Sequence, residues 1–301
     1  MNRGYEYRGP VQGAAAGETL LDYLARRYPH TAGPEWELRI LSGSVLLDEQ
    51  PARPGAVLRG SETLTWKRPG WDEPTAPLSF ALLHRDADLL AVLKPAGLPT
   101  LPGGGYLEHT LLALLRRRYP EASPLHRIGR PATGLVLCSR NRPAAARLSR
   151  DWSAGKVRKS YRALVAGVPL RQSFTVDVPI GKIPHREGGF VHAATAAGKP
   201  SLSRVEVLEA RENQALVEIE IVTGRPHQAR IHLAASGHPL SGDPLYGPGG
   251  VPLPGTTSRP GEGGFLLHSH RLQLEHPSTG EPLFLEAPPP MPLRRSRDSG
   301  S

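Results

Sequence analysis

The chain has 301 residues, 39% of them hydrophobic and 22% charged, which is enough for one large folded domain or two smaller ones. No apolar run approaches the roughly 20 residues of a membrane span, and the first residues lack the apolar core of a secretory signal. We therefore expect a cytoplasmic protein without a membrane partner. Cys138 is the single cysteine, which excludes an intramolecular disulfide and a cysteine-rich zinc site.

Lysine and arginine outnumber aspartate and glutamate by 37 to 28, which gives a formal net charge of +9. An excess of cations favours polyanionic partners, because neutralising phosphates releases condensed counterions whatever the base sequence. The composition is therefore compatible with a nucleic-acid partner, and a solvated basic surface is the alternative interpretation.

Residues 1–66 predict a small N-terminal module. Three leucines share a helical face behind the possible cap Thr19, and Pro34 fits the first turn of a second helix. Short apolar runs separated by turn residues predict a small β-ribbon over residues 43–66. The proline-rich, polar residues 67–77 predict a linker.

A larger domain is predicted over residues 78–287, followed by a disordered tail at residues 288–301. An apolar run ending at Lys94 predicts a buried strand, and amphipathic segments further on predict helices. Alternating valine and isoleucine on both sides of Glu212 and Asn213 predict an antiparallel hairpin. Antiparallel strands separated by helices favour an α+β fold over a parallel nucleotide-binding sheet.

The stretch TGRPHQARIHLAASGHPLSGDPLYG offers the most chemistry. Arg225 follows a predicted strand at the start of a predicted helix, beside Gln228, where functional groups are commonly displayed. The alternative is that Arg225 and Arg230 decorate an exposed helix. A functional role is favoured, because the following loop combines Asp243 and Tyr246 with glycines and prolines.

Two further stretches carry groups that could hold RNA. In RKSYRALVAG, Tyr161 could stack on a base while neighbouring cations such as Lys159 hold phosphate, although an ordinary strand-edge tyrosine explains the pattern equally well. In HRIGRPATGLVLCSR, a polar turn precedes an apolar strand. His126, Arg127 and Arg130 in that turn can hold or donate, but the turn contains no acid or nucleophile.

The twelve histidines do not predict a metal site. His227 and His232 are five residues apart, about 140° around a helix, so they cannot share one face. His268 and His270 would share the face of a strand, but no cysteine or carboxylate pattern completes a ligand set. Walker, dinucleotide-binding and serine-hydrolase motifs are also missing from the sequence.

Taken in order, five stretches resemble the RluA-type family of RNA pseudouridine synthases: DADLLAVLKPAGLPT, HRIGRPATGLVL, RKSYRALVAG, TGRPHQARIHLAASGHPLSGDPLYG and LLHSHRLQLEHPSTGEPLFLEAPPP. Residues 17–66 resemble, more loosely, a ribosomal-type RNA-binding module. The resemblance implies a mixed, largely antiparallel sheet with flanking helices around an RNA-binding cleft. It also implies isomerisation of uridine in ribosomal or transfer RNA, without metal or organic cofactor. We expect a monomer that does not bind DNA.

The resemblance also assigns roles to individual residues. A flipped-out uridine is required, because the reacting atoms are shielded inside a stacked helix. Tyr161 would stack on that base, and Arg225 would pair with the catalytic aspartate. The residues expected to contact RNA are His126, Arg127, Arg130, Lys159, Gln228 and Arg230.

Gly129 departs from the family motif, which reads His-Arg-Leu-Asp where this chain reads His126, Arg127, Ile128 and Gly129. Glycine can supply neither acid-base nor nucleophilic catalysis. Three explanations stay open. Another carboxylate could enter the pocket, with Asp243 and Asp88 as candidates; the chain could bind RNA in the same cleft without isomerase activity; or positioning and strain alone could drive the reaction.

Overall fold

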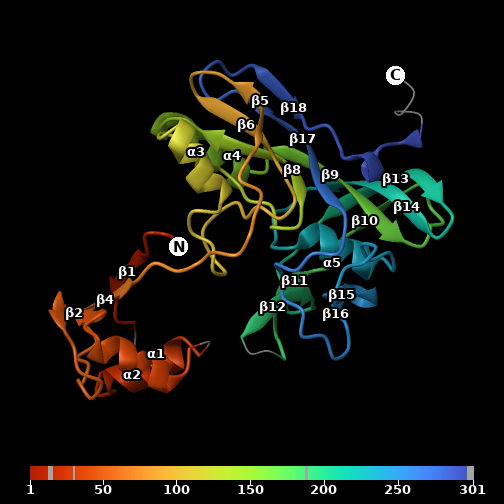
Figure 1. Cartoon of the computed structure of the whole chain (residues 1–301). Coiled ribbons are helices and arrows are strands. Elements are labelled where there is room, and N and C mark those ends of the chain that lie inside the picture. Colours follow the sequence, from red (N-terminus) through yellow and green to blue (C-terminus); the bar gives the residue numbers. More distant parts are fainter. Residues whose placement is uncertain (13–15, 30, 187–188, 297–301) are drawn as a thin grey trace. The chain divides into compact units, whose positions relative to one another are not determined.

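A computed structural model covers the chain and describes residues 1–12, 16–29, 31–186 and 189–296 (Figure 1). The chain divides into two compact units, Met1–Glu73 and Pro74–Ser301. Among the helices of the described residues, none is both long enough and apolar enough to cross a membrane.

The N-terminal unit packs two helices against a four-stranded sheet of order β1-β4-β2-β3. Thr19 caps the first helix as predicted, because its hydroxyl accepts the amide proton of Asp22 at 3.2 Å. The core of the N-terminal unit includes the buried side chains of Leu20, Leu24 and Trp36. The elements are α1 (Leu20–Arg27), α2 (Gly33–Leu41), β1 (Tyr5–Pro10), β2 (Val45–Leu47), β3 (Gln50–Pro51) and β4 (Thr63–Arg68).

Strand β1 was not predicted, and the predicted linker begins too early. Tyr5 pairs with Arg68 in the antiparallel ladder of β1 and β4, so the first two residues of the predicted linker belong to a strand. The guanidinium of Arg68 also lies 3.5 Å from the ring centre of Trp71. A partner more than 60 residues away in the sequence stabilises this edge, and local patterns do not reveal such a partner.

The larger unit is built on a ten-stranded sheet whose main path is β10-β13-β14-β9-β17-β8-β6-β5. The pairing of β17 with β8 is parallel, and the other pairings in this sheet are antiparallel. This confirms the predicted α+β fold. The strands are β5 (Ala81–Arg85), β6 (Leu89–Lys94), β7 (Ser123–Pro124), β8 (Thr133–Ser139), β9 (Arg158–Ala166), β10 (Ser173–Val176), β13 (Ser203–Arg211), β14 (Gln214–Ile221), β17 (Leu267–Glu275) and β18 (Pro282–Glu286).

Two small hairpins lie outside this sheet, formed by β11 (Ile180–Pro184) with β12 (Phe190–Ala194) and by β15 (Tyr246–Gly247) with β16 (Val251–Pro252). Three helices cover the sheet: α3 (Leu111–Arg118), α4 (Arg142–Ser153) and α5 (Gln228–Ala235). Short 3-10 turns span Pro248–Gly250 and Met291–Leu293.

Strand β6 shows why its sequence is an unbroken apolar run. Leu90 and Val92 pack with the core under α3, whereas Leu89 and Ala91 pack with Leu148 of α4 on the opposite face. Both faces of the strand are therefore buried, and alternation with polar residues is not needed. The strand carries the chain from one edge of the unit to the cavity described below.

The C-terminal tail is ordered further than predicted. Leu293 is fully buried against Leu164 and Leu216, and the guanidinium of Arg211 donates to the carbonyl oxygens of Pro292 and Arg294 at 2.9 and 2.8 Å. These contacts fix the chain as far as residue 296. The remaining predicted tail, residues 297–301, lies outside the described residues.

Candidate active site

A cavity of about 540 Å³ lies between the loop after β7, strand β9 and the start of α5. It brings together nine of the residues singled out in the sequence, which come from three separate stretches of the chain. They are His126, Arg127, Gly129, Arg130, Lys159, Tyr161, Arg225, Gln228 and Arg230.

The loop carrying Gly129 is held from behind by the turn that follows β6. The amide of Gly97 donates to the carbonyl oxygen of Arg130 at 2.9 Å, and the hydroxyl of Thr100 donates to that of Ile128 at 2.9 Å. The buried ammonium of Lys94 donates to three carbonyl oxygens, one of them that of Arg130 at 3.3 Å. Burial, together with the nearby charge of Arg130, lowers the pKa of Lys94 to about 7.

His126 serves the protein backbone. Its Nε2 accepts the amide proton of Leu137 at 3.0 Å, and its ring stacks on Trp152 with centres 4.9 Å apart. Burial, assisted by the charge of Lys159, lowers the pKa of His126 to about 3. The ring is therefore neutral at physiological pH and positions the loop through Leu137.

Tyr161 and Lys159 project from β9 into the cavity. Tyr161 packs against the core clusters on both sides of the cavity, and burial raises its pKa to about 12, so its hydroxyl stays protonated. The ammonium of Lys159 lies 5.6 Å from the ring centre of Trp152, and burial lowers the pKa of Lys159. The two side chains place an aromatic ring and a cation side by side.

Gln228 fixes the junction between β14 and α5. Its side-chain oxygen accepts from the Thr223 hydroxyl at 2.8 Å and from the Arg225 amide at 3.0 Å. Its side-chain nitrogen donates to the Leu202 carbonyl and the Ser203 hydroxyl at 2.9 and 3.0 Å. These four bonds use the whole hydrogen-bonding capacity of the Gln228 side chain, and its role here is to position Arg225. The guanidinium of Arg225 donates to the Pro200 carbonyl oxygen.

Arg230 does not decorate an exposed helix. It forms a buried bidentate pair with Asp243, with both N–O distances at 2.7 Å. Asp243 also accepts the amide protons of Leu245 and Tyr246. Asp243 does not line the cavity, because its carboxylate is committed to Arg230 and to this turn.

Asp88 directly precedes β6, at the opposite end of that strand from the cavity. Its two oxygens accept from the Asn141 side chain at 2.7 Å and the Ser278 hydroxyl at 2.6 Å. The structure therefore brings neither of the two candidate substitute acids, Asp243 and Asp88, to Gly129.

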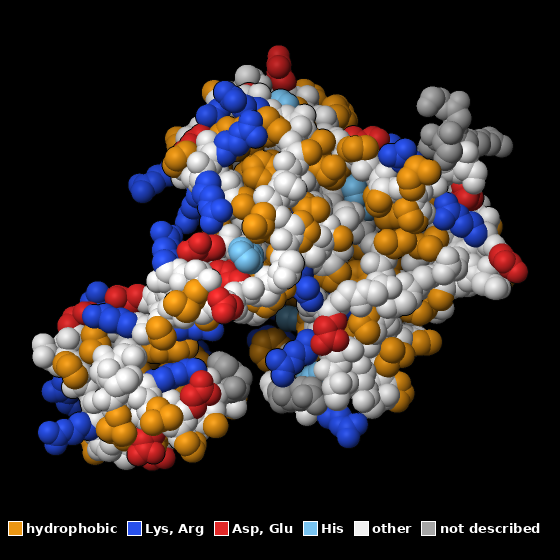
Figure 2. Space-filling view, in the orientation of Figure 1, with side chains coloured by type: hydrophobic (Ala, Val, Ile, Leu, Met, Phe, Trp, Pro, Cys, Tyr) orange, Lys and Arg blue, Asp and Glu red, His pale blue; other side chains and the backbone are white. Residues whose placement is uncertain are grey.

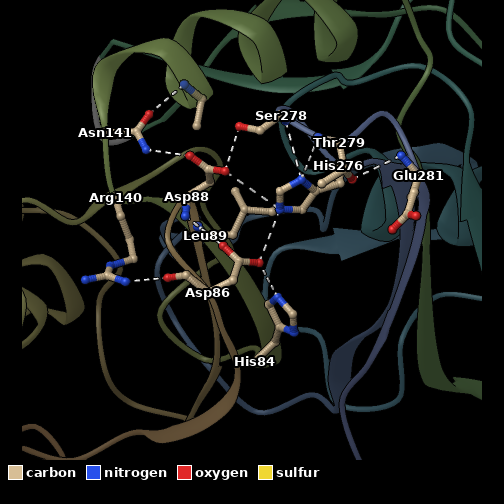
Figure 3. Close-up of polar contacts among 11 residues, drawn as sticks. His84, Asp86, Asp88, Leu89, Arg140, Asn141, His276, Ser278, Thr279 and Glu281 are labelled. Atoms are coloured by element: carbon tan, nitrogen blue, oxygen red, sulfur yellow. Dashed lines mark hydrogen bonds and ion pairs between the residues drawn. The ribbon is translucent and has the colours of Figure 1, made fainter.

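Asp86, Asp88 and His276 have ligand atoms within 4.8 Å of one another, which is a spacing that could hold a metal ion. The hydrogen bonds argue for a different role. The Nδ1 atom of His276 accepts the amide protons of Ser278 and Thr279, so Nε2 carries the proton and donates to Asp86 at 3.3 Å (Figure 3). That proton occupies the position a metal would need. The network ties the turn before β6 to the turn after β17.

His268 and His270 both lie on β17, so the predicted strand is confirmed, and both side chains are buried. His268 donates through Nε2 and His270 through Nδ1 to the same carbonyl oxygen, that of Ala287, at 3.1 and 3.0 Å. Their function is to bind the segment after β18 to the sheet.

The cavity is cationic. None of its lining residues in the described part of the chain is an aspartate or glutamate, whereas Arg127, Arg130, Lys159 and Arg225 all line it. Gly129 has an ordinary backbone conformation, and a Cβ atom there would contact only the ring of Pro131, at 3.7 Å. The backbone therefore has room for the aspartate of the family motif.

Sequence reasoning missed several residues that shape the cavity. Lys94, Thr100 and Trp152 act by holding the loop of Gly129 and the ring of His126, and Gly261 accepts from Arg130 at 3.0 Å. The Lys-Pro pair after a buried strand was a usable signal for Lys94. The other contacts join segments distant in the sequence, which no local pattern reports.

Comparison with known proteins points to one family. Residues 88–235 match the family model described as RNA pseudouridylate synthase. An RNA pseudouridine synthase of Synechocystis, itself described as uncharacterized, is 43% identical over 276 residues, which cover 91% of this chain and 95% of the relative. The ribosomal large subunit pseudouridine synthase D of Xanthomonas campestris is 34% identical, over 95% of this chain and 89% of the relative.

A solved structure agrees. Human RNA pseudouridylate synthase domain containing 1 matches with a TM-score of 0.58 and 28% identity, over 74% of this chain and 89% of that chain. Motifs, fold and relatives therefore converge. The chain belongs to the RNA pseudouridine synthases, in the RluA-type branch that its motifs resemble, and these enzymes are isomerases that convert uridine in RNA to pseudouridine.

Proposed function

We propose that the chain isomerises uridine in ribosomal RNA and that the target base enters the cavity lined by Tyr161, Arg225 and Gly129. The observation that carries the proposal is the convergence of three distant motif segments on that one cavity. The choice of ribosomal RNA is supported by relatives that are named for the ribosomal large subunit. Transfer RNA is the competing substrate.

Each part of the cavity suits a flipped-out nucleotide. The ring of Tyr161 offers a stacking surface, worth roughly 1 to 3 kcal/mol per base. Arg127 and Arg130 flank Gly129 and can hold the phosphates on either side of the base. Lys159 and Arg225 line the same cavity, where they can neutralise charge that develops on the uracil or ribose.

Cations also gather outside the cavity. Figure 2 shows Lys and Arg side chains gathered over α3 and its neighbouring segments. The last turn of α3 carries Arg116, Arg117 and Arg118, all exposed. Such a stripe can follow an RNA backbone without reading its sequence.

One observation favours a second candidate function, RNA binding without isomerisation. No carboxylate lines the cavity among the described residues, and glycine occupies the position of the family's catalytic aspartate. A binder would use the same cations for phosphate and leave the uridine unchanged.

Release of tritium from uridine carbon 5 separates the two functions, because isomerisation replaces that hydrogen by a carbon bond. Ribosomal and transfer RNA transcripts labelled there would be incubated with the unmodified protein. We expect release from the ribosomal transcript. Tight binding without release from either transcript would establish the second function, and release from the transfer RNA alone would overturn the substrate assignment.

A further inference from the structure

Gly129 leaves a space at the wall of the cavity. Its backbone is exposed, its φ lies in the ordinary range, and a Cβ atom added there would meet only the Cδ atom of Pro131, at 3.7 Å. The motif that this loop resembles carries a carboxylate at that position. A group of carboxylate size can therefore stand in front of Gly129 without displacing the loop.

The charges around this space favour an anion. Lys159 and Arg225 both line the cavity. The Lys159 ammonium lies 3.5 Å from the point where a Cβ on Gly224, the residue before Arg225, would be. Arg127 and Arg130 lie on the same loop as Gly129. Asp243 cannot neutralise these cations, because Arg230 and two backbone amides bind it. Cations gathered in a partly enclosed cavity repel one another unless an anion joins them.

We infer that the space in front of Gly129 binds a small monocarboxylate anion, which supplies to the bound uridine the carboxylate that the chain lacks at residue 129. The inference rests on the proposed function. In this arrangement the bound anion takes the place of the motif's aspartate as the carboxylate partner of Arg225.

Contact distances set the size of this anion. An aspartate side chain is joined to its Cα by a bond of about 1.5 Å. An unbonded carbon stays about 3.5 to 4.0 Å away. A free acetate must therefore lie about 2 Å deeper in the cavity than an aspartate side chain. Formate, which lacks the methyl group, places its carboxylate closer to the aspartate position. We expect formate to act best, acetate less well and branched acids not at all.

The reaction balances without another reactant. The bond from N1 to C1′ breaks with its electron pair left on the uracil, and a bond from C5 to C1′ forms. The proton on C5 leaves to water and N1 takes up a proton. The carboxylate acts transiently as base or nucleophile and is released unchanged, so nothing is oxidised or reduced.

The test measures tritium release from labelled ribosomal RNA by the unmodified protein in a buffer free of carboxylates. Sodium formate would be titrated against sodium chloride at equal ionic strength, with acetate and pivalate as size controls. We expect a saturable rise of about tenfold or more with formate, a smaller rise with acetate and none with pivalate or chloride. Gly129→Asp should release tritium without formate, and Gly129→Ala should respond less.

Filter binding of the same RNA to each variant controls for folding and affinity. The unmodified protein could release tritium at a rate that formate does not change, or that chloride raises equally. Either result overturns the anion inference and leaves the proposed function standing. Silence of the unmodified protein with and without formate, although it binds the RNA, overturns the anion inference and the proposed function together, whether or not Gly129→Asp is active.

Discussion

The two ends of strand β6 carry opposite charge. The acidic groups at one end are hydrogen-bonded within the protein, whereas the cations near the other end line an open cavity. Asp86 and Asp88 precede the strand, and Lys94 ends it about 20 Å away. At the acidic end the carboxylates are closed into a network, and hydrogen bonds from Ser278 and Asn141 hold the pKa of Asp88 below its usual value. At the cationic end, arginine and lysine side chains line an open cavity.

Some charged side chains are bound by partners within the protein, and others are available to a ligand. The carboxylates near β6 and the pair of Arg230 and Asp243 have their partners within the protein. The distribution between the two units supports the same distinction. The N-terminal unit has 9 Lys and Arg against 10 Asp and Glu, whereas the larger unit has 28 against 18. The cationic excess therefore belongs entirely to the unit that contains the cavity.

The largest effect on stability is expected from the ion pair of Arg230 and Asp243. Asp243→Asn leaves Arg230 buried without its charge partner, which should lower the free energy of unfolding by about 3 to 5 kcal/mol. Urea unfolding measures this, and the double variant Asp243→Asn with Arg230→Met should recover part of the loss. A large fall in tritium release at unchanged stability would instead identify Asp243 as a catalytic acid.

The next effect concerns Arg225, which lines the cavity and donates to the carbonyl oxygen of Pro200. Arg225→Ala should lower kcat/KM for tritium release about 100-fold, equivalent to about 2.7 kcal/mol, with unchanged unfolding. The kcat/KM of Arg225→Lys should lie between those of the unmodified protein and Arg225→Ala. Arg204, which pairs with Glu220 at 2.9 Å and does not line this cavity, provides the control Arg204→Ala. Equal losses in the two alanine variants would remove Arg225 from the site.

The acidic end should affect stability and leave catalysis intact. Asp86→Asn disturbs the bonds from His84 and His276 and should cost about 1 to 3 kcal/mol in urea unfolding. The rate per folded molecule should stay the same. Because the His276 proton points at Asp86, EDTA should leave the melting temperature unchanged. A drop in melting temperature with EDTA, restored by a divalent cation, would show that the network holds a metal.

The effect that is smallest near neutral pH is a pH dependence of stability, which comes from His126. The folded pKa of His126, about 3, lies below its ordinary value of 6.5, so between these values the unfolded chain binds a proton that the folded chain does not. Stability should fall as pH drops through this window, by at most about 1.4 kcal/mol per pH unit from this residue. His126→Gln, which can still accept the Leu137 proton, should flatten the fall. An unchanged slope would contradict the neutral-ring assignment.

Much of the fold could be predicted because its signals are local. Thr19 as a helix cap and the hairpin turning at Glu212 and Asn213 follow from residue type and periodicity, and both are confirmed. Strand β1 and the ordered tail around Leu293 were missed. Their stability comes from partners far away in the sequence, which a pattern of neighbouring residues does not contain.

The candidate site could likewise be predicted only in part. Motif order was enough to collect the cavity residues, since Gly129, Tyr161 and Arg225 all line it. The sequence could not decide where Asp88 and Asp243 lie, because a carboxylate in a motif can serve a turn as well as a substrate. Only the bonds to Asn141 and Arg230 show that both are engaged elsewhere.

Direct analysis of nucleosides tests the central claim most simply. Ribosomal RNA transcript treated with the unmodified protein, with formate present, would be digested and its pseudouridine measured by chromatography, in parallel with Tyr161→Phe and Tyr161→Leu. We predict pseudouridine from the unmodified protein and from Tyr161→Phe, which keeps the stacking ring, and far less from Tyr161→Leu. Equal pseudouridine from all three proteins, or none from the unmodified protein while it binds the transcript, would contradict uridine isomerisation in this cavity.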